Sequence, residues 1–317
     1  MPHPIEPADE RVHAVDPDEP TWNESWFFSW IDTEGGPAGF FRLGVLPNQQ
    51  RAMLWFFVNV DGAWLGIDES RIALDDLDLS NGVSYDQFGL RFAWVPRAGG
   101  REATFSFDAS LLTRSGDGVG SYVPVAVDLA CRATGDRYGT VHGDDDRESS
   151  YARSRFEQSL EASGVVGVDD ARHEVRGGSH RDRSWGPRDW RLAFTMGDLQ
   201  PGDRELFFVG APGYDGGGGY IRERSGELTS LVGDQVTLGY DDEARTITPG
   251  RLGFVTTDGS RVDVDLAPIG QSIPFDMAHT CEEPETWLYY RTLVEAHVSG
   301  WERPCRGWLD ASRYGIR

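Results

Sequence analysis

Short apolar or alternating segments, separated by turn-forming residues, recur along this chain and constrain its fold more than any other feature. Asp-Gly and Asn-Gly pairs, which favour tight hairpins, separate several of them, and 39 glycines provide for many further turns. Helical periodicity is scarce, so the pattern predicts an all-β fold of sandwich or barrel type. The segments are Phe40–Val45, Met53–Val60, Leu90–Val95, Ala103–Phe107, Tyr122–Leu129, Leu206–Gly210, Leu252–Thr257, Arg261–Leu266 and Leu288–Val298. The turn pairs are Asp61-Gly62, Asn81-Gly82, Asp117-Gly118 and Asp258-Gly259.

The length of 317 residues is comfortable for two domains. A Ser-Trp pair occurs at Ser25-Trp26 and again at Ser184-Trp185, 184 − 25 = 159 positions later and close to half the chain. We interpret this as two tandem β domains, residues 20–162 and 163–317, after a flexible acidic tail of residues 1–19. A chance likeness of two aromatic strands is the alternative.

The charge pattern excludes several classes of partner. The net charge is −22, and all 30 basic residues are arginine. Without lysine, neither a Schiff base nor a Walker-type phosphate lysine is available. Because no long basic cluster occurs, nucleic acid and anionic membrane surfaces are disfavoured as partners. The field of the acidic surface favours a monomer, and a homodimer is the other assembly that we expect.

The chain also lacks targeting and redox signals. No apolar run approaches the roughly 20 residues of a membrane span, and residues 1–20 are polar and acidic, unlike a signal peptide. Stable membrane insertion is therefore not expected. The three cysteines, Cys131, Cys281 and Cys305, form no CxxC pair, which favours a reducing cytoplasm.

Residues 177–190 combine tryptophan with a high density of charge, which is typical of the wall of a ligand cavity. In a strand, Arg181, Arg183 and Trp185 share one face, and His180, Asp182 and Ser184 share the other. Arg183 would orient or polarise a substrate oxygen, and the Trp185 ring would support an apolar or cationic intermediate. Asp182 and Asp189 would anchor the arginines from behind. A structural Arg–Asp network that closes the barrel is the alternative.

Other carboxylates and a tyrosine are candidates for proton transfer. Glu157 lies in an apolar segment, where a raised pKa would let it act as an acid, although an ordinary edge-strand charge is the alternative. Glu24 has a similar but weaker claim between Trp22 and Trp26. Tyr214 and Asp215, before a glycine run, could donate a proton, with a turn aspartate as the alternative.

Metal and cofactor motifs are missing. His142, His173, His180, His279 and His297 are scattered, and neither HExxH nor H-x-H occurs. Residues 213–219 lack the strand-to-helix context of a dinucleotide or phosphate loop. We therefore expect neither a metal site nor a cofactor.

The chain resembles the two-domain lipocalin-like proteins that include bacterial carotenoid 1,2-hydratases (hydroxyneurosporene synthases) and lipocalin-like Diels–Alderases. The hydratases carry an Asp-His-Asn-Trp-Gly element, and the matching residues here are Asp182-Arg183-Ser184-Trp185-Gly186. An uncharacterised branch is more similar, over roughly residues 20–310. It shares Asn23-Glu24-Ser25-Trp26, Phe156-Glu157-Gln158, the 181–190 block, and Gly219-Tyr220 before Gly226-Glu227-Leu228.

This resemblance implies two β-barrel-like domains with a pocket in or between them. In the hydratases, the histidine and tryptophan of the element are implicated in protonating or guiding an isoprenoid double bond. Trp185 matches, but Arg183 replaces the histidine, and arginine is a poor general acid. The change favours isomerisation, cyclisation or binding of an oxygenated apolar substrate over hydration by the family's route.

We therefore expect a cofactor-independent enzyme that hydrates, isomerises or cyclises an apolar isoprenoid-, steroid- or polyketide-like molecule. Glu157, or else Asp215, would move the proton. A non-catalytic carrier of a lipid or other hydrophobic ligand is the alternative. The expected substrate-binding residues are Trp185, Trp190, Trp26, Trp30, Glu24, Arg181 and Arg188.

Overall fold

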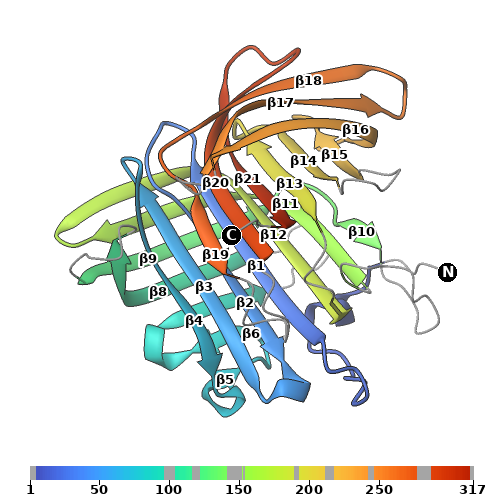
Figure 1. The fold of residues 1–317 in the computed structure, drawn as a ribbon. Helices are drawn as coiled ribbons and strands as arrows, with labels where there is room; N and C mark the ends of the chain where they lie inside the picture. Colours follow the sequence, from blue (N-terminus) through green and yellow to red (C-terminus); the bar gives the residue numbers. More distant parts are fainter. Residues whose placement is uncertain are drawn as a thin grey trace. The chain divides into compact units, whose positions relative to one another are not determined.

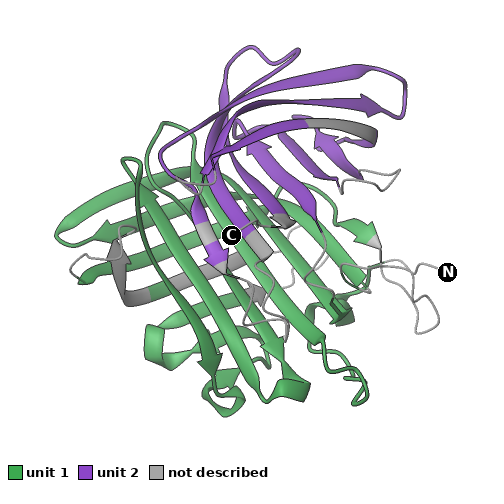
Figure 2. Ribbon diagram, viewed as in Figure 1, with its two compact units in different colours: residues 1–189 green, residues 190–317 purple. Residues whose placement is uncertain are grey.

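The computed structural model describes residues 5–95, 104–115, 122–140, 152, 154–188, 193–210, 218–241, 246–276 and 287–314. The chain divides into two compact units, Met1–Asp189 and Trp190–Arg317 (Figure 2). Helix in the described part is limited to 3-10 turns such as η1 (Pro7–Glu10). None of these described helices has the length and apolar composition needed to cross a bilayer.

Unit 1 is an antiparallel sheet that closes on itself. Eight of its described strands follow one another around a ring in the order β1-β2-β3-β4-β8-β9-β11-β12, and β12 pairs with β1 to close it (Figure 1). This is an up-and-down β-barrel. The bounds are β1 Trp22–Asp32, β2 Ala38–Leu46, β3 Arg51–Val60, β4 Ala63–Ile72, β5 Leu77–Asp78, β6 Gly82–Tyr85, β7 Leu90–Val95, β8 Thr104–Ser115, β9 Tyr122–Ala133, β10 Tyr138–Thr140, β11 Ser154–Val168 and β12 Ala171–Pro187.

Unit 2 repeats the same arrangement. Its described strands form a ring in the order β13-β14-β15-β16-β17-β18-β20-β21, and β21 pairs with β13. The bounds are β13 Phe194–Gln200, β14 Glu205–Gly210, β15 Gly218–Arg222, β16 Leu228–Asp241, β17 Thr246–Thr256, β18 Arg261–Pro268, β19 Ile273–Asp276, β20 Trp287–Val298 and β21 Cys305–Tyr314. The expectation of an all-β, tandem barrel architecture is confirmed.

The turn residues act locally as the sequence predicts. Asp61 and Gly62 join β3 to β4 with φ angles of 52° and 81°, the two positive values that a type I′ hairpin turn requires. Gly259 (φ 86°) occupies the turn between β17 and β18. Asp117-Gly118 lies outside the described residues.

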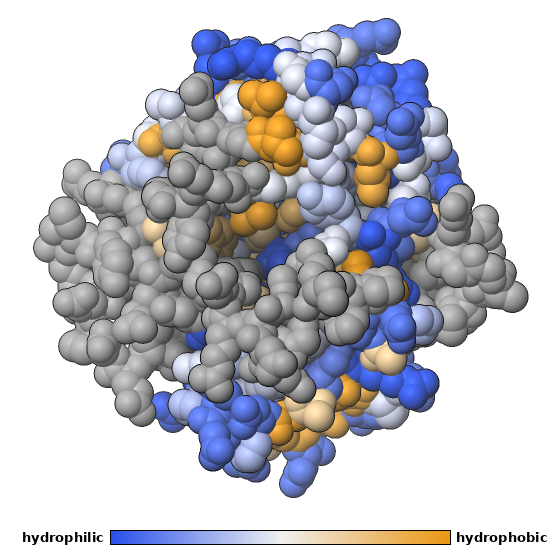
Figure 3. Space-filling view, turned by 90° about the vertical axis from the view of Figure 1, so that its right-hand side faces the viewer, coloured by the Kyte–Doolittle hydropathy of each residue, from blue (hydrophilic) through white to orange (hydrophobic). Residues whose placement is uncertain are grey.

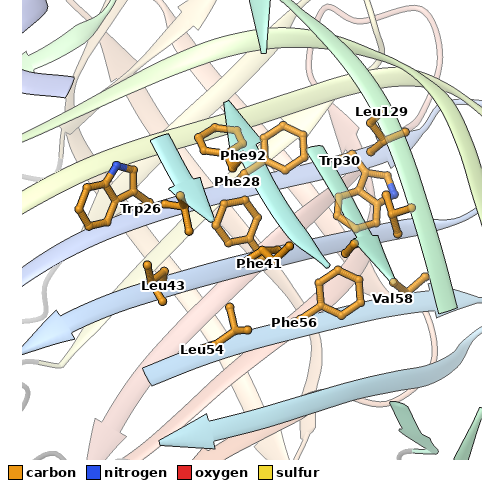
Figure 4. Packing of buried hydrophobic residues seen from close by; sticks show 14 of the residues in the cluster. Trp26, Phe28, Trp30, Phe41, Leu43, Leu54, Phe56, Val58, Phe92 and Leu129 are labelled. Carbon is orange, nitrogen blue, oxygen red and sulfur yellow. The ribbon is translucent and has the colours of Figure 1, made fainter. Parts of the chain in front are cut away.

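Aromatic rings pack together in the interior of the first barrel. Phe28 lies 6.1 Å from Phe41 and 5.5 Å from Phe92 between ring centroids, and both contacts are within the range of favourable aromatic pairs. Trp26 and Trp30 lie at opposite ends of this row (Figure 4). Trp30 is fully buried in this core.

On the face that Figure 3 shows, the surface of the described residues is mainly hydrophilic, as the net charge of −22 leads one to expect. In the view of Figure 3, the hydrophobic residues of the described part form small, separate groups. The large hydrophobic side chains that are exposed among the described residues are Val12, Tyr122, Val209, Val232 and Val255.

The structure differs from the expected domain organisation in three details. The compact units divide after residue 189, whereas the expected junction at 162/163 falls inside β11. Ser25 and Ser184 are not equivalent positions of two domains, because they face each other across the β1–β12 pair of one barrel. The described part of the expected tail, residues 5–19, includes Glu10 and His13, which make partly buried contacts with the barrel.

Candidate functional site

Strand β12 places its alternating side chains on the two faces of the first barrel, as predicted. Arg183 is paired with Trp26 of β1 and Phe156 of β11, so it shares their face. That face is the barrel interior, because Trp26 belongs to the interior core. His180 and Asp182 therefore lie on the outer face. We call Glu10, His13, Glu24, Arg137, Arg181, Arg183 and Trp185 the inner cluster, and Arg155, Glu157, His180, Asp182, Ser184 and Arg188 the outer cluster.

Arg183 and Glu24 form a buried ion pair in the inner cluster, and both side chains are fully enclosed. The guanidinium carbon lies 3.8 Å from the centroid of the Trp26 ring, a cation–π contact. The guanidinium also donates to the carbonyl oxygens of Ser25 and Arg11, at 3.1 and 2.7 Å. These contacts hold Arg183 in one position.

His13 joins this pair from the N-terminal segment. Its ring stacks on Trp185 with 3.8 Å between centroids and 8° between planes, and its Nδ1 lies 3.2 Å from both Glu24 oxygens. Burial by itself would raise the pKa of Glu24. Arg183 and His13 outweigh burial and lower that pKa, so Glu24 is held ionised.

The outer cluster contains a histidine–carboxylate pair. His180 Nε2 lies 2.7 Å from Glu157 Oε2, and both side chains are buried. Arg155 forms an ion pair with the other oxygen of Glu157. Burial would raise the pKa of Glu157, but Arg155 and His180 together lower it. Glu157 is therefore the ionised carboxylate of this cluster.

The pKa of Asp182, beside this pair, is shifted in the opposite direction. Arg155 Nη2 donates to its Oδ2 at 3.0 Å, whereas Oδ1 is buried and accepts no hydrogen bond within the part of the chain that the structure describes. Burial, reinforced by the charge of Glu157, raises the pKa of Asp182. The two carboxyl groups thus have pKa values displaced in opposite directions.

Several expected roles change. The raised pKa belongs to Asp182 and not to Glu157, because Glu157 receives the stronger cationic contacts. Glu157 and Trp185 lie on opposite faces of the sheet, so they do not meet at one ligand. Asp182 anchors Arg155 instead of Arg181 or Arg183.

The remaining candidates fall into two groups. Trp30 is a core residue, and Arg188 donates to Ser184 Oγ at 2.6 Å. Asp189, Trp190, Tyr214 and Asp215 lie outside the described residues.

The sequence did not predict the side-chain partners that come from distant segments of the chain. Glu10 and His13 stand in a stretch that reads as a loose acidic tail, so nothing local marks them. A further buried ion pair occurs in unit 2, where Arg291 Nη1 donates to Asp310 Oδ2 at 2.5 Å. The sign of this pair in the sequence is Arg291, a single arginine within an apolar strand. No group of three or more metal-binding His, Cys, Asp or Glu side chains occurs among the residues described.

Two closed up-and-down barrels in tandem define a lipocalin-like two-barrel protein. The chain belongs to the family described as the domain of unknown function DUF7064, whose profile matches residues 6–310. A search of curated proteins gives no match.

Solved structures share this fold at low sequence identity. A candidate AttH protein from Nitrosomonas europaea is 14% identical with a TM-score of 0.65, covering 98% of this chain and 97% of that one. CghA with Sch210972 is 14% identical with a TM-score of 0.54, covering 98% and 96%. Kievitone hydratase from Nectria haematococca is 12% identical with a TM-score of 0.51, covering 98% and 94%. These similarities establish the fold.

Proposed function

We propose that this protein is a cofactor-independent enzyme that hydrates, isomerises or cyclises an oxygenated apolar small molecule, with the outer cluster as its reactive centre. One observation carries the proposal. Glu157 and Asp182 are buried on adjacent strands with pKa values displaced in opposite directions, and His180 contacts Glu157. Carboxyl groups separated in this way are the usual signature of an acid and a base that act together.

In this proposal, Asp182, whose pKa is raised by burial, donates its proton to a carbon of the substrate double bond. Water then attacks the neighbouring carbon, and its proton passes to His180. If Nε2–H donates to Glu157, which the ionised carboxylate favours, then Nδ1 takes up that proton. One water is consumed per double bond, and transfer from the imidazolium back to Asp182 resets the site. Loss of a different proton from the cation gives isomerisation instead.

The cationic groups of the cluster would orient the substrate. Arg155 is the partly exposed member, with 19% of its side chain accessible, and it reaches both carboxylates. A substrate carbonyl or hydroxyl oxygen beside Arg155 or Arg188 would receive charge-assisted hydrogen bonds. The substrate's oxygen would in this way set the distance between Asp182 and the reacting carbon.

The comparisons support this class of chemistry by fold only. Kievitone hydratase is a hydratase by name, and CghA was crystallised with the compound Sch210972. One fold hosts many functions, so the named residues carry the assignment. The substrate would be isoprenoid-, steroid- or polyketide-like, and we propose that a cytoplasmic monomer or homodimer acts on it.

The carrier alternative requires apolar space inside a barrel. In the described part of unit 1, aromatic rings that include Phe28, Phe41 and Phe92 occupy this interior. That packing favours chemistry on the outer face over storage of a lipid in the first barrel.

The test is turnover of a panel of terpenoids, steroids and polyketides, followed by mass spectrometry for isomers and for products heavier by one water. Asp182→Asn should reduce turnover about 10²- to 10⁴-fold and leave the fold intact, since asparagine has nearly the same size and its side-chain oxygen can still accept the hydrogen bond from Arg155. For the wild type, kcat/KM should fall as pH rises through the raised pKa of Asp182.

Glu161→Gln is the matched control, because Glu161 lies on β11, the strand paired with that of Asp182, but is exposed. It should turn over substrate at the wild-type rate. Wild-type turnover by a folded Asp182→Asn protein would exclude Asp182 as the acid. If no compound in the panel is converted but some are retained unchanged, the carrier alternative replaces the proposal.

A further inference from the structure

The N-terminal segment covers one end of the first barrel without joining its sheet. Within the described structure, residues 5–15 contain no strand, and the main-chain bonds of η1 are local, from Asp9 to Glu6 and from Arg11 to Ala8. Side chains of the barrel hold the segment instead: Arg183 donates to the Arg11 carbonyl and Arg137 to the Glu6 carbonyl. Contacts of this kind can be exchanged for those of a ligand.

The central contact is a carboxylate held by two arginines. Glu10 accepts two parallel hydrogen bonds from Arg181, at 2.8 and 2.7 Å, the bidentate geometry that arginine offers to carboxylates. Arg137 Nη2 lies 3.0 Å from the same carboxylate. The Glu10 side chain is 7% exposed, and that of Arg181 is 2% exposed.

Residues of the barrel itself hold the side chains of these arginines in place. Gln158 Oε1 accepts hydrogen bonds from Arg181 Nε and Nη2 at 3.0 and 2.6 Å, and Gln158 Nε2 donates to the Gly135 carbonyl. The Phe156 ring lies 5.2 Å from the Arg181 guanidinium and 5.4 Å from that of Arg137. None of these supports belongs to the N-terminal segment, so the anion site does not need the segment in order to form.

Apolar surface adjoins the carboxylate position. Trp22, Phe156 and Trp185 form one buried cluster, and Ile5 and Val15 pack against it. The segment thus presents a carboxylate flanked by apolar side chains, which is the chemical pattern of an apolar carboxylic acid.

Electrostatics favour an anion at this position. Burial would raise the pKa of Glu10, but Arg181, Arg137 and Arg183 outweigh burial and lower it. Removal of the Glu10 carboxylate would leave buried guanidinium groups short of one negative charge, a state with a large energetic penalty.

We propose that Arg181, Arg137, Gln158 and Phe156 form a binding site for the carboxylate of an apolar acid, and that Glu10 fills this site from within the chain until such a ligand displaces it. The site lies on the interior face, opposite to the outer cluster, and does not depend on the chemistry proposed there. A ligand of the wild-type protein must compete with Glu10. Its apparent affinity is therefore the intrinsic affinity of the site multiplied by the fraction of molecules in which the segment is released.

The experiment uses benzoate and acetate as probes of the full-length protein, with sodium chloride at equal ionic strength as the salt control. Glu10→Ala should lower the Tm, and benzoate should restore it with a saturable dependence. Benzoate should bind this variant at least ~10-fold more tightly than the wild type and more tightly than acetate. Asp18→Ala, which removes an exposed acid of the same segment, should behave as the wild type.

The double variant Glu10→Ala/Arg181→Met should lose the response to benzoate. If benzoate raises the Tm of Glu10→Ala no more than chloride does, the proposal is wrong. If Glu10→Ala does not fold, the proposal is tested instead by trypsin cleavage of the wild type after the exposed Arg11. Benzoate should accelerate that cleavage by releasing the segment, and an unchanged rate at saturating benzoate would overturn the proposal.

Discussion

Replacing Arg183 by methionine tests the reasoning about the inner cluster most directly. Methionine keeps an unbranched apolar side chain against Trp26 but removes the cation. Glu24, which is fully buried, then keeps only His13 of the two partners that together outweigh its desolvation. The carbonyl oxygens of Ser25 and Arg11 also lose a donor.

The expected loss of stability is large. Breaking a buried ion pair by removing one partner costs about 3–5 kcal/mol. For a unit of 189 residues, each kcal/mol corresponds to about 2–4 °C in Tm, so the decrease should be roughly 6–20 °C.

The loss should also depend on pH. In the wild type, the lowered pKa of Glu24 contributes stability that is present above the unfolded-state pKa and is lost as pH falls through the folded value. In Arg183→Met, only His13 remains to oppose burial, so the folded pKa of Glu24 moves upward and this contribution to stability shrinks. The difference between the two proteins should therefore be largest near neutral pH and shrink toward about pH 4.

Urea unfolding at several pH values, followed by tryptophan fluorescence, measures this difference. Arg183→Met/Glu24→Gln should recover part of the lost stability, because no buried charge remains unpaired. A loss below about 1 kcal/mol at pH 7 would refute the reasoning, as would a loss of equal size at pH 7 and at about pH 4.

Two further substitutions test the packing of each barrel. A Cβ at Gly39 would lie 2.2 Å from the Trp30 ring, so Gly39→Ala should destabilise unit 1 by about 1–3 kcal/mol in urea unfolding; Gly167→Ala, where the nearest atoms are 3.8 Å away, is the control and should change stability little. Arg291→Met leaves the buried Asp310 carboxylate without its ion-pair partner and should destabilise unit 2 by about 3–5 kcal/mol. Hydrogen exchange should then accelerate in β20 and β21 with unit 1 unchanged, and equal acceleration in both units would contradict the prediction.

The local pattern predicted the elements and the faces of β12 correctly because these depend on neighbouring residues. Alternation in a strand has a period of two, so Arg181, Arg183 and Trp185 had to share one face once residues 181–185 were extended. The type I′ turn at Asp61-Gly62 follows for the same reason, since few other residue pairs adopt two positive φ angles.

The partners of these side chains could not be predicted, because they come from distant parts of the chain. Arg183 meets Glu24 because closure of the barrel places β12 beside β1, and Arg181 meets Glu10 because the N-terminal segment crosses the barrel end. The Ser-Trp likeness at 25 and 184 suggested two equivalent domains, yet it belongs to two paired strands of one barrel.

The sequence by itself determined an all-β chain, its hairpin turns, and the division of β12 into two chemically different faces. Tertiary structure alone decided which charge neutralises which, and hence the direction in which the pKa of each carboxyl group is shifted. In the sequence, Glu157 lies in an apolar segment and Asp182 lies between two arginines, which would favour a raised pKa for Glu157. In the structure, the contacts of Arg155 and His180 lower the pKa of Glu157, while burial raises that of Asp182. A pKa depends on the three-dimensional distribution of charge and solvent around a group, and the linear order of residues does not contain that distribution.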